Sequence, residues 1–285
     1  MFNVECSNQE GSVFPEFGLF RGYAPRNTSV MFQILMSRLQ QGHRTIGYPA
    51  TAPVLPERFR GRPVLVPELT AATAAPAVDA CPVGAFGICE GRPQLDLGLC
   101  LFCGACAKAC QPGLITFTRE HRLAARRRED LVIRPGPAPA ALPPALHAEA
   151  KKLFARSFKL REVSAGGCGA CEADVNVLNT VVFDLGRFGI QFVAAPRHAD
   201  GLLVTGPVSQ HMRLALEKTY AATPAPKFVI AVGACAIGGG PYRDHAEVHN
   251  GVSPVLPVDL FIPGCPPHPI TILDGLLRFL GRIRE

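Results

Sequence analysis

One run of cysteines constrains this 285-residue chain more than any other feature. The spacing C-x2-C-x2-C-x3-C is formed by Cys100, Cys103, Cys106 and Cys110. Upstream, Cys81 is followed by a proline, which is how a second run of this kind ends. The three earlier positions of that second run hold Ala71, Ala74 and Ala77. The chain therefore carries one complete run and only the last cysteine of another.

Paired runs of this type hold two iron–sulfur clusters, and the fourth cysteine of each run ligates the cluster of the other. One [4Fe–4S] cluster therefore keeps its ligands, which are Cys81, Cys100, Cys103 and Cys106. The second cluster would retain Cys110 alone, so we expect it to be lost. We predict that Cys110 is a small buried apolar residue, and we assign no site role to it, to Cys89 or to Cys6.

Composition agrees with metal-ligating thiols. Eleven cysteines are an odd number, so they cannot all pair in internal disulfides. Residues 1–10 are polar and do not resemble a secretion signal, so we expect reduced thiols, which favour metal ligation over disulfide formation. The net charge of +6 is mild and gives no reason to expect a nucleic-acid partner.

The sequence predicts four regions. Residues 1–52 are an N-terminal extension with an amphipathic helix over 29–42, and residues 53–130 are a ferredoxin-like iron–sulfur domain. Residues 131–152 are a Pro/Ala-rich linker, and residues 153–285 are the C-terminal domain. The polar face of the helix carries only Arg38, which favours packing on its own domain over a membrane surface or a partner subunit. The charged segment 121–130 is expected to be solvated surface.

The C-terminal region alternates short apolar runs with a helical pattern. We expect strands at 192–195, 202–205, 228–232 and 258–262, and a helix over 211–222. This alternation predicts an α/β fold with a doubly wound parallel sheet, in which functional groups follow the carboxyl ends of the strands. A smaller α+β domain precedes it.

The second cysteine set fits that rule. It consists of Cys168, Cys171, Cys235 and Cys265. Four thiolates suit one [4Fe–4S] cluster. They also suit zinc, although structural zinc sites more often pair two C-x2-C knuckles. Neighbouring glycines would let the backbone approach a bulky cofactor; they are Gly166, Gly167, Gly233, Gly238, Gly239 and Gly264.

Other residues near this set have two interpretations each. Glu172 would either relay protons or act as a carboxylate at a helix N-terminus. His198 and Arg197 are expected beside the thiols, either raising the cluster potential or making ordinary loop hydrogen bonds. Asp259 is expected to be structural. We find no phosphate-binding loop and no residues that suggest independent bond chemistry, so no catalytic residue is assigned.

Four ordered motifs carry a family resemblance: 166–172 (GGCGACE), 196–207 (PRHADGLLVTGP), 232–239 (VGACAIGG) and 258–267 (VDLFIPGCPP). They resemble the small subunit of membrane-bound [NiFe] hydrogenases of the formate-hydrogenlyase type, and also the quinone-proximal iron–sulfur subunit of complex I. The resemblance implies a flavodoxin-like fold with a [4Fe–4S] cluster on the second cysteine set. The C-x2-C spacing at Cys168 is the hydrogenase-like form. Residues 48–63 and the first cysteine set resemble the ferredoxin-like subunit of the same complexes.

The resemblance implies an oxidoreductase subunit with two [4Fe–4S] clusters that passes electrons to a catalytic large subunit. That partner would be [NiFe] or quinone-binding, and membrane-anchor subunits would complete the complex. The expected location is peripheral, on the cytoplasmic side of the cytoplasmic membrane. The alternatives are a complex-I-like subunit that delivers electrons to quinone and a non-catalytic iron–sulfur carrier.

Overall fold

The computed structural model describes residues 30–136, 145, 152–154 and 156–283. The chain divides into two compact units, residues 1–43 and 44–285. The described part of the first unit contains helix α1 (Val30–Gln41), which confirms the helix predicted there. It ends at Gly42, whose φ of 63° is left-handed. The side chains of Ile34 and Leu39 are exposed. Cys6 and most of the predicted linker lie outside the described residues.

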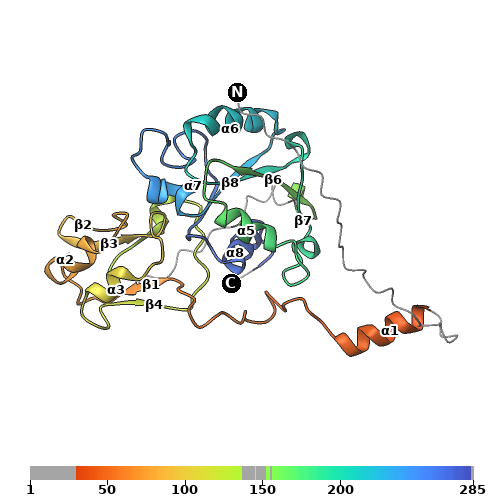
Figure 1. Cartoon of the computed structure of the whole chain (residues 1–285), viewed down its shortest axis with the longest axis horizontal. Helices are drawn as coiled ribbons and strands as arrows, with labels where there is room; N and C mark the ends of the chain where they lie inside the picture. The colour runs from red at the N-terminus through yellow and green to blue at the C-terminus, as the bar shows by residue number, and fades with distance from the viewer. Residues whose placement is uncertain (1–29, 137–144, 146–151, 155, 284–285) are drawn as a thin grey trace, which may run out of the picture. The chain divides into compact units, whose positions relative to one another are not determined.

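The C-terminal part of the second unit is built on a parallel five-stranded sheet (Figure 1). Its strands are β6 (Phe158–Ser164), β7 (Ile190–Phe192), β8 (Gly201–Thr205), β9 (Phe228–Val232) and β10 (Leu260–Ile262). They lie in the order β10-β9-β8-β6-β7. Counted along the chain from β6, this is the 2-1-3-4-5 order of flavodoxin-like proteins. The flavodoxin-like, doubly wound parallel sheet predicted for the C-terminal domain is therefore confirmed.

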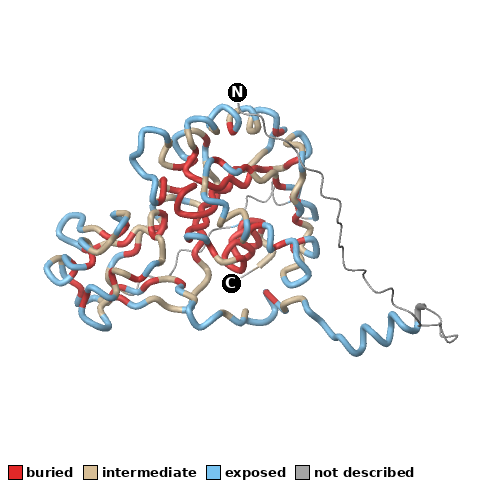
Figure 2. Tube along the Cα trace, in the orientation of Figure 1, coloured by how far each residue is buried: buried red, intermediate tan, exposed pale blue. Residues whose placement is uncertain are grey.

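Helices cover both faces of this sheet. Figure 1 shows α6 (Gln210–Ala222) on one face, and α5 (Ala170–Val177) and α8 (Pro269–Phe279) on the other. Side chains of β8 alternate between the two faces, because Leu202 and Val204 join one hydrophobic core and Leu203 joins the other. Both faces of the sheet and the whole of α8 are buried (Figure 2).

Two strands differ from the sequence prediction. Strand β6, which lies between β8 and β7 in the sheet, was missed because Lys159, Arg161 and Glu162 interrupt its apolar residues. Strand β7 was expected at 192–195 but spans Ile190–Phe192. It begins earlier because Ile190 is fully buried and pairs with Phe158. In both cases the pairing partner decides the strand, and local hydrophobicity does not reveal it.

The preceding part of the second unit is a small α+β arrangement. Its elements are β1 (Pro63–Leu65), α2 (Ala71–Asp79), β2 (Phe86–Cys89), β3 (Arg92–Asp96), α3 (Ala105–Ala109) and β4 (Ile115–Phe117). Strand β1 pairs with β4, and β2 and β3 form a hairpin that is extended by β5 (Val132–Ile133). The order β-α-β-β-α-β is that of ferredoxin-like domains.

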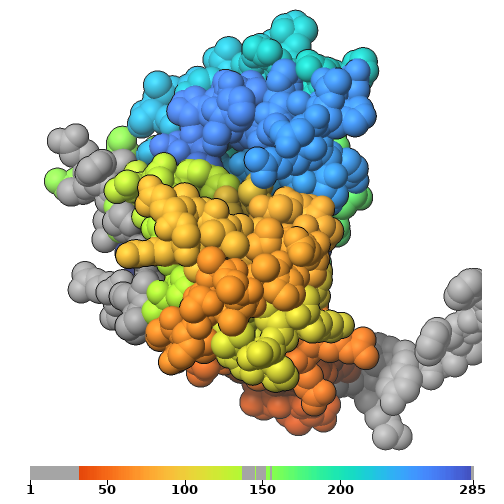
Figure 3. All heavy atoms as spheres, turned by 90° about the vertical axis from the view of Figure 1, so that its left-hand side faces the viewer, coloured from red at the N-terminus to blue at the C-terminus, as the bar shows by residue number. Residues whose placement is uncertain are grey.

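The charged segment 121–130 joins the two parts, so the prediction of a solvated surface is wrong. Ala125 exchanges two backbone hydrogen bonds with Phe261 of β10, at N···O distances of 2.9 and 2.8 Å. Arg128 donates two hydrogen bonds to the Asp96 carboxylate, at 2.7 and 2.6 Å. Within the segment Arg127 and Glu129 are exposed, whereas the apolar residues Leu123, Ala124 and Ala125 are buried. Figure 3 shows the two parts packed directly against each other.

No helix among the described residues has the length and hydrophobicity needed to cross a bilayer.

Candidate metal centres

The second cysteine set gathers at the carboxyl edge of the parallel sheet. Cys168 and Cys171 lie in the turn from β6 into α5, Cys235 opens α7 (Ala234–Gly238) after β9, and Cys265 follows β10. Because parallel strands all end at the same edge, three loops far apart in sequence meet there. The thiols are electrostatic neighbours: each of the other three raises the pKa of Cys171.

Glycine makes room for these thiols at two positions. A Cβ atom on Gly233 would lie 2.5 Å from the Sγ of Cys171, and one on Gly240 would lie 2.6 Å from the Sγ of Cys235. Both glycines also have left-handed φ angles, 91° and 55°. Gly233 therefore leaves room for the Cys171 thiol, and its predicted close approach to a cofactor stays a prediction. Gly238 has a different role, because its Cβ would clash with the Leu99 side chain at 2.3 Å.

The first cysteine set also comes together. Cys81 follows α2, and Cys100, Cys103 and Cys106 surround the turn into α3. Cys81, Cys103 and Cys106 all raise the pKa of Cys100. Backbone N–H groups already point at the sulfurs: Ala85 N donates to Cys81 Sγ at 3.2 Å, and Phe102 N donates to Cys100 Sγ at 3.3 Å. Such donors stabilise the negative charge of ligating sulfur.

Burial dominates the electrostatics of both sets. It raises the pKa of Cys100 and of Cys235 to about 12, and neighbouring thiols add to the effect. Without a metal these thiols are therefore protonated at neutral pH, and metal binding must displace their protons. Among the described residues, no group of three or more His, Cys, Asp or Glu side chains is close enough together to hold a single metal ion. The thiols are thus neighbours, but less tightly gathered than the four ligands of one zinc ion.

The arrangement of the thiols in both sets suits a bulky group that is bound by thiolates. Each set supplies four sulfurs from separate turns. The first set adds N–H donors, and the second adds glycines where a Cβ would reach the sulfur. Both sets therefore fit an iron–sulfur cluster.

The second cluster site of the ferredoxin-like part, which the sequence predicts to be lost (the lost site), is filled by protein. The three alanines lie in α2, where Ala74 and Ala77 are fully buried. Cys110 is buried as predicted, and its Sγ lies 3.5 Å from the carbonyl oxygen of Thr73. Thr70 and Thr73 form a capping box that begins the helix. Cys89 is exposed on β2.

Glu172 lies in the first turn of α5 beside the second cysteine set. Its Oε1 accepts hydrogen bonds from the hydroxyls of Ser164 and Thr205, both at 2.6 Å. Burial acts to raise its pKa, but these hydroxyls outweigh burial and hold the pKa below its ordinary value. Burial and the Glu172 charge raise the pKa of Glu162 on β6 to about 7. The helix N-terminal position is thus observed, and proton relay stays a prediction.

His198 and Arg197 do not lie beside the thiols, so their predicted place is wrong. They precede β8, and the neighbouring Asp200 exchanges hydrogen bonds with the backbone of Lys159 at the start of β6. That is the amino edge of the sheet, whereas Cys168 follows the carboxyl end of β6. The reason is that β7 pairs only with the first three residues of β6 and never reaches the other edge. Asp259 is structural as predicted, since it accepts a hydrogen bond from Val229 N at 2.9 Å.

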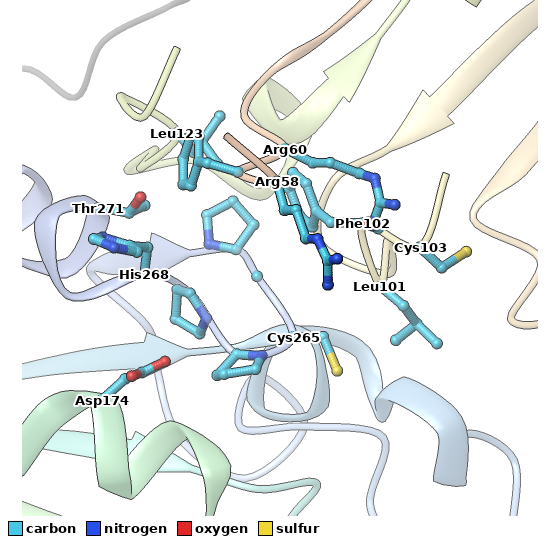
Figure 4. A pocket seen from close by; sticks show the side chains of 15 residues that line it. Arg58, Arg60, Leu101, Phe102, Cys103, Leu123, Asp174, Cys265, His268 and Thr271 are labelled. Atoms are coloured by element: carbon cyan, nitrogen blue, oxygen red, sulfur yellow. The ribbon is translucent and has the colours of Figure 1, made fainter. Parts of the chain in front are cut away.

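The two cysteine sets meet at one cavity of about 330 Å³ (Figure 4). Cys103 of the first set and Cys265 of the second both line it, and Cys103 raises the pKa of Cys265. Arg58 and Arg60 line the same cavity. Sequence patterns assigned no role to these arginines; the three arginines of RFRGRP, residues 58–63, were the only signal.

A flavodoxin-like sheet with four thiols at its carboxyl edge defines a class of iron–sulfur protein. The sequence profile of the NADH ubiquinone oxidoreductase 20 kDa subunit family matches residues 168–279. A probable membrane-bound hydrogenase subunit, mbhJ, from Pyrococcus furiosus is 39% identical over 134 residues, which are 47% of this chain and 80% of that protein.

Two further relatives belong to different enzymes. Formate hydrogenlyase subunit 7 of Escherichia coli is 40% identical over 134 residues, covering 47% of this chain and 52% of that protein. An NADH-quinone oxidoreductase subunit of Heliobacterium modesticaldum is 38% identical over 133 residues, covering 46% of this chain and 75% of that protein. The chain belongs to the NADH ubiquinone oxidoreductase 20 kDa subunit family. It is thus an oxidoreductase subunit of a family that binds an iron–sulfur cluster and works within multi-subunit complexes.

Proposed function

We propose that this chain is the electron-transfer subunit of a membrane-associated [NiFe] hydrogenase complex of the formate-hydrogenlyase type. It would fuse a ferredoxin-like domain to the 20 kDa subunit domain and carry two [4Fe–4S] clusters. When bound, such clusters supply one-electron transfer at potentials set by their protein surroundings. The observation that carries the proposal is the shared cavity, where Cys103 and Cys265 bring the two thiolate sets side by side.

The protein holds this arrangement rigidly. Leu99 packs into the space left by Gly238, so the residue before Cys100 contacts the turn after Cys235. A single hydrophobic core includes Leu95 and Ile115 of the ferredoxin-like part and Val204 of the sheet. Fixed spacing suits electron transfer, because the two sites need no motion to exchange an electron.

Two observations favour a hydrogenase partner. Cys168 and Cys171 have the C-x2-C spacing of the hydrogenase-like form, and two of the three relatives described above are a hydrogenase subunit and a formate hydrogenlyase subunit. We infer that a catalytic large subunit covers the carboxyl edge of the sheet, where Cys168 and Cys265 are exposed. Membrane-anchor subunits would hold the complex at the cytoplasmic face of the membrane.

The second candidate is a complex-I-like subunit that delivers electrons to quinone. The similarity to the NADH-quinone oxidoreductase subunit of Heliobacterium modesticaldum favours it. The two candidate functions differ in the partner subunit. A hydrogenase large subunit with two C-x2-C pairs would bind nickel, and a quinone-binding subunit would not. Nickel analysis of the complex purified through this chain distinguishes them, and a nickel-free, quinone-reducing complex would exclude the hydrogenase.

The cluster count is tested on the full chain by iron, zinc and acid-labile sulfide analysis, with EPR of the reduced protein. We expect about eight iron atoms per chain, four for each thiolate set. About four would mean that one set holds no cluster, and about twelve would show that the second ferredoxin cluster is not lost. Zinc without sulfide would contradict the proposal.

A further inference from the structure

The cavity between the two cysteine sets contains two arginines, Arg58 and Arg60, whose function the cluster ligands do not explain. In Figure 4 the guanidinium group of Arg58 points into the space between Cys265 and Cys103, and Arg60 extends alongside Phe102. Both arginines come from the loop before β1, which is otherwise remote in sequence from Cys265. The fold therefore brings two cations to the junction of the two sites.

Arg60 is held against the loop that carries Cys103. Its Nη1 donates a hydrogen bond to the carbonyl oxygen of Phe102 at 3.2 Å. A Cβ atom on Gly104 would lie only 3.2 Å from the Nε of Arg60, and Gly104 has a left-handed φ of 76°. Gly104 thus has two functions: it adopts the left-handed backbone conformation of the turn, and it leaves room for the guanidinium group of Arg60.

The positive charge of the pair is not neutralised by a neighbouring carboxylate. Among the described residues, neither Arg58 nor Arg60 forms an ion pair. Asp174 is the carboxylate that lines the cavity, and Figure 4 places it beside His268, on the other side of the Cys265 loop from Arg60. The two guanidinium groups therefore bring positive charge to the cavity that Cys103 and Cys265 line.

The effect of such charges on a loaded site has a definite sign. Four thiolates give each site a negative charge, and reduction adds one more. A cation nearby stabilises the reduced form more than the oxidised form, which raises the reduction potential. A cation between two sites also lessens the repulsion between electrons held on both. Solvent exposure of the two arginines weakens the effect but does not change its sign.

We propose that Arg58 and Arg60 set the reduction potentials of both sites by placing two positive charges at the junction of Cys103 and Cys265. This inference rests on the proposed function, since both thiolate sets must hold clusters. Arg58 acts on both sites, because it points between them. Arg60 acts mainly on the ferredoxin-like site, because it is bound to the loop of Cys103.

The test is an EPR-monitored redox titration of the full chain carrying Arg58→Gln, Arg58→Lys, Arg60→Gln or Arg213→Gln. Arg58→Gln is expected to lower both potentials, with a three- to tenfold change in the reduction equilibrium, where tenfold is about 59 mV for one electron. Arg60→Gln should lower the ferredoxin-like potential more than the other. Arg58→Lys keeps the charge and should keep both potentials. Arg213 on α6, paired with Glu217 at 2.9 Å, is the control for net charge.

Iron content separates the possible failures. Full iron with unchanged potentials in Arg58→Gln and Arg60→Gln overturns this inference and leaves the proposed function intact. The inference is also overturned if Arg213→Gln shifts the reduction potentials as much as Arg58→Gln does. The same holds if Arg58→Lys shifts them as much as Arg58→Gln does. If Arg58→Gln loses iron, the Arg60→Gln titration decides. A wild-type chain without iron would remove the proposed function and this inference together.

Discussion

The ferredoxin-like part contains two predicted cluster sites, one that we expect to be retained and one that we expect to be lost. At the site expected to be retained, the four thiols come from two turns, and each turn has an N–H group that points at a sulfur. At the lost site, the three ligand positions are alanines in a capped helix, and the remaining cysteine is packed in the core. The comparison shows that side chains of the core pack where the ligands of the second cluster would stand. Small residues then allow a helix to close over the space.

The strongest test of the comparison removes one cysteine from each site. Cys103→Ala takes one of four ligands from the retained site, so iron should fall from about eight to about four atoms per chain. Cys110→Ala removes a buried thiol that has no remaining partner ligands, so iron should stay at about eight. Iron and sulfide analysis of the two variants measures both. Equal iron loss in both would mean that the lost site still binds a cluster.

A larger residue at the lost site tests whether it is filled. Ala74 is fully buried in α2, so Ala74→Leu should overpack the core and destabilise the protein by about 1–3 kcal/mol. Ala75→Leu, one position along and exposed, should change stability by less than about 0.5 kcal/mol. Urea unfolding followed by circular dichroism compares them. A neutral Ala74→Leu would show that a void remains where the cluster was.

The connection of segment 121–130 to the ferredoxin-like part is tested at Arg128, which pairs with Asp96 of β3. Arg128→Ala removes the two hydrogen bonds that Arg128 donates to the half-buried Asp96 carboxylate, which keeps only the one from Gly98 N, and should cost about 1–2 kcal/mol. Arg127→Ala breaks only an exposed pair with Glu129 and should cost about 0–0.5 kcal/mol. The same unfolding measurement applies. If the two variants have the same free energy of unfolding, the ion pair between Asp96 and Arg128 does not contribute to the stability of the protein.

The smallest expected effect concerns the cap of the helix that fills the lost site. Thr70→Ala removes the side chain that accepts from Thr73 N, and should cost about 1 kcal/mol. Thr70→Ser keeps a hydroxyl and should be close to wild type. Iron content should not change in either variant. A loss of iron on Thr70→Ala would mean that α2 also supports the retained site.

Much of the site followed from the sequence because metal-binding spacing is local. The run at Cys100 and the glycine-flanked pair at Cys168 are visible without any fold, and so is the loss of three ligands to alanine. The alternation of apolar runs also predicted the parallel sheet. The predictions failed where the neighbours of a residue in the fold are far from it in the sequence. Strand β6 looked too charged, and His198 was placed at the wrong edge because the short pairing of β7 is invisible in the sequence.

The sequence by itself determined which residues can ligate metal and at which site only Cys110 remains as a ligand, because those properties depend on residue type and short spacing. Only the tertiary structure decided that Cys103 and Cys265 share a cavity and that Arg58 and Arg60 stand at their junction. The tertiary structure also shows that segment 121–130, which the sequence predicted to be solvated, connects the two parts. The physical reason is that these relations depend on long-range packing and strand register, which no local pattern encodes.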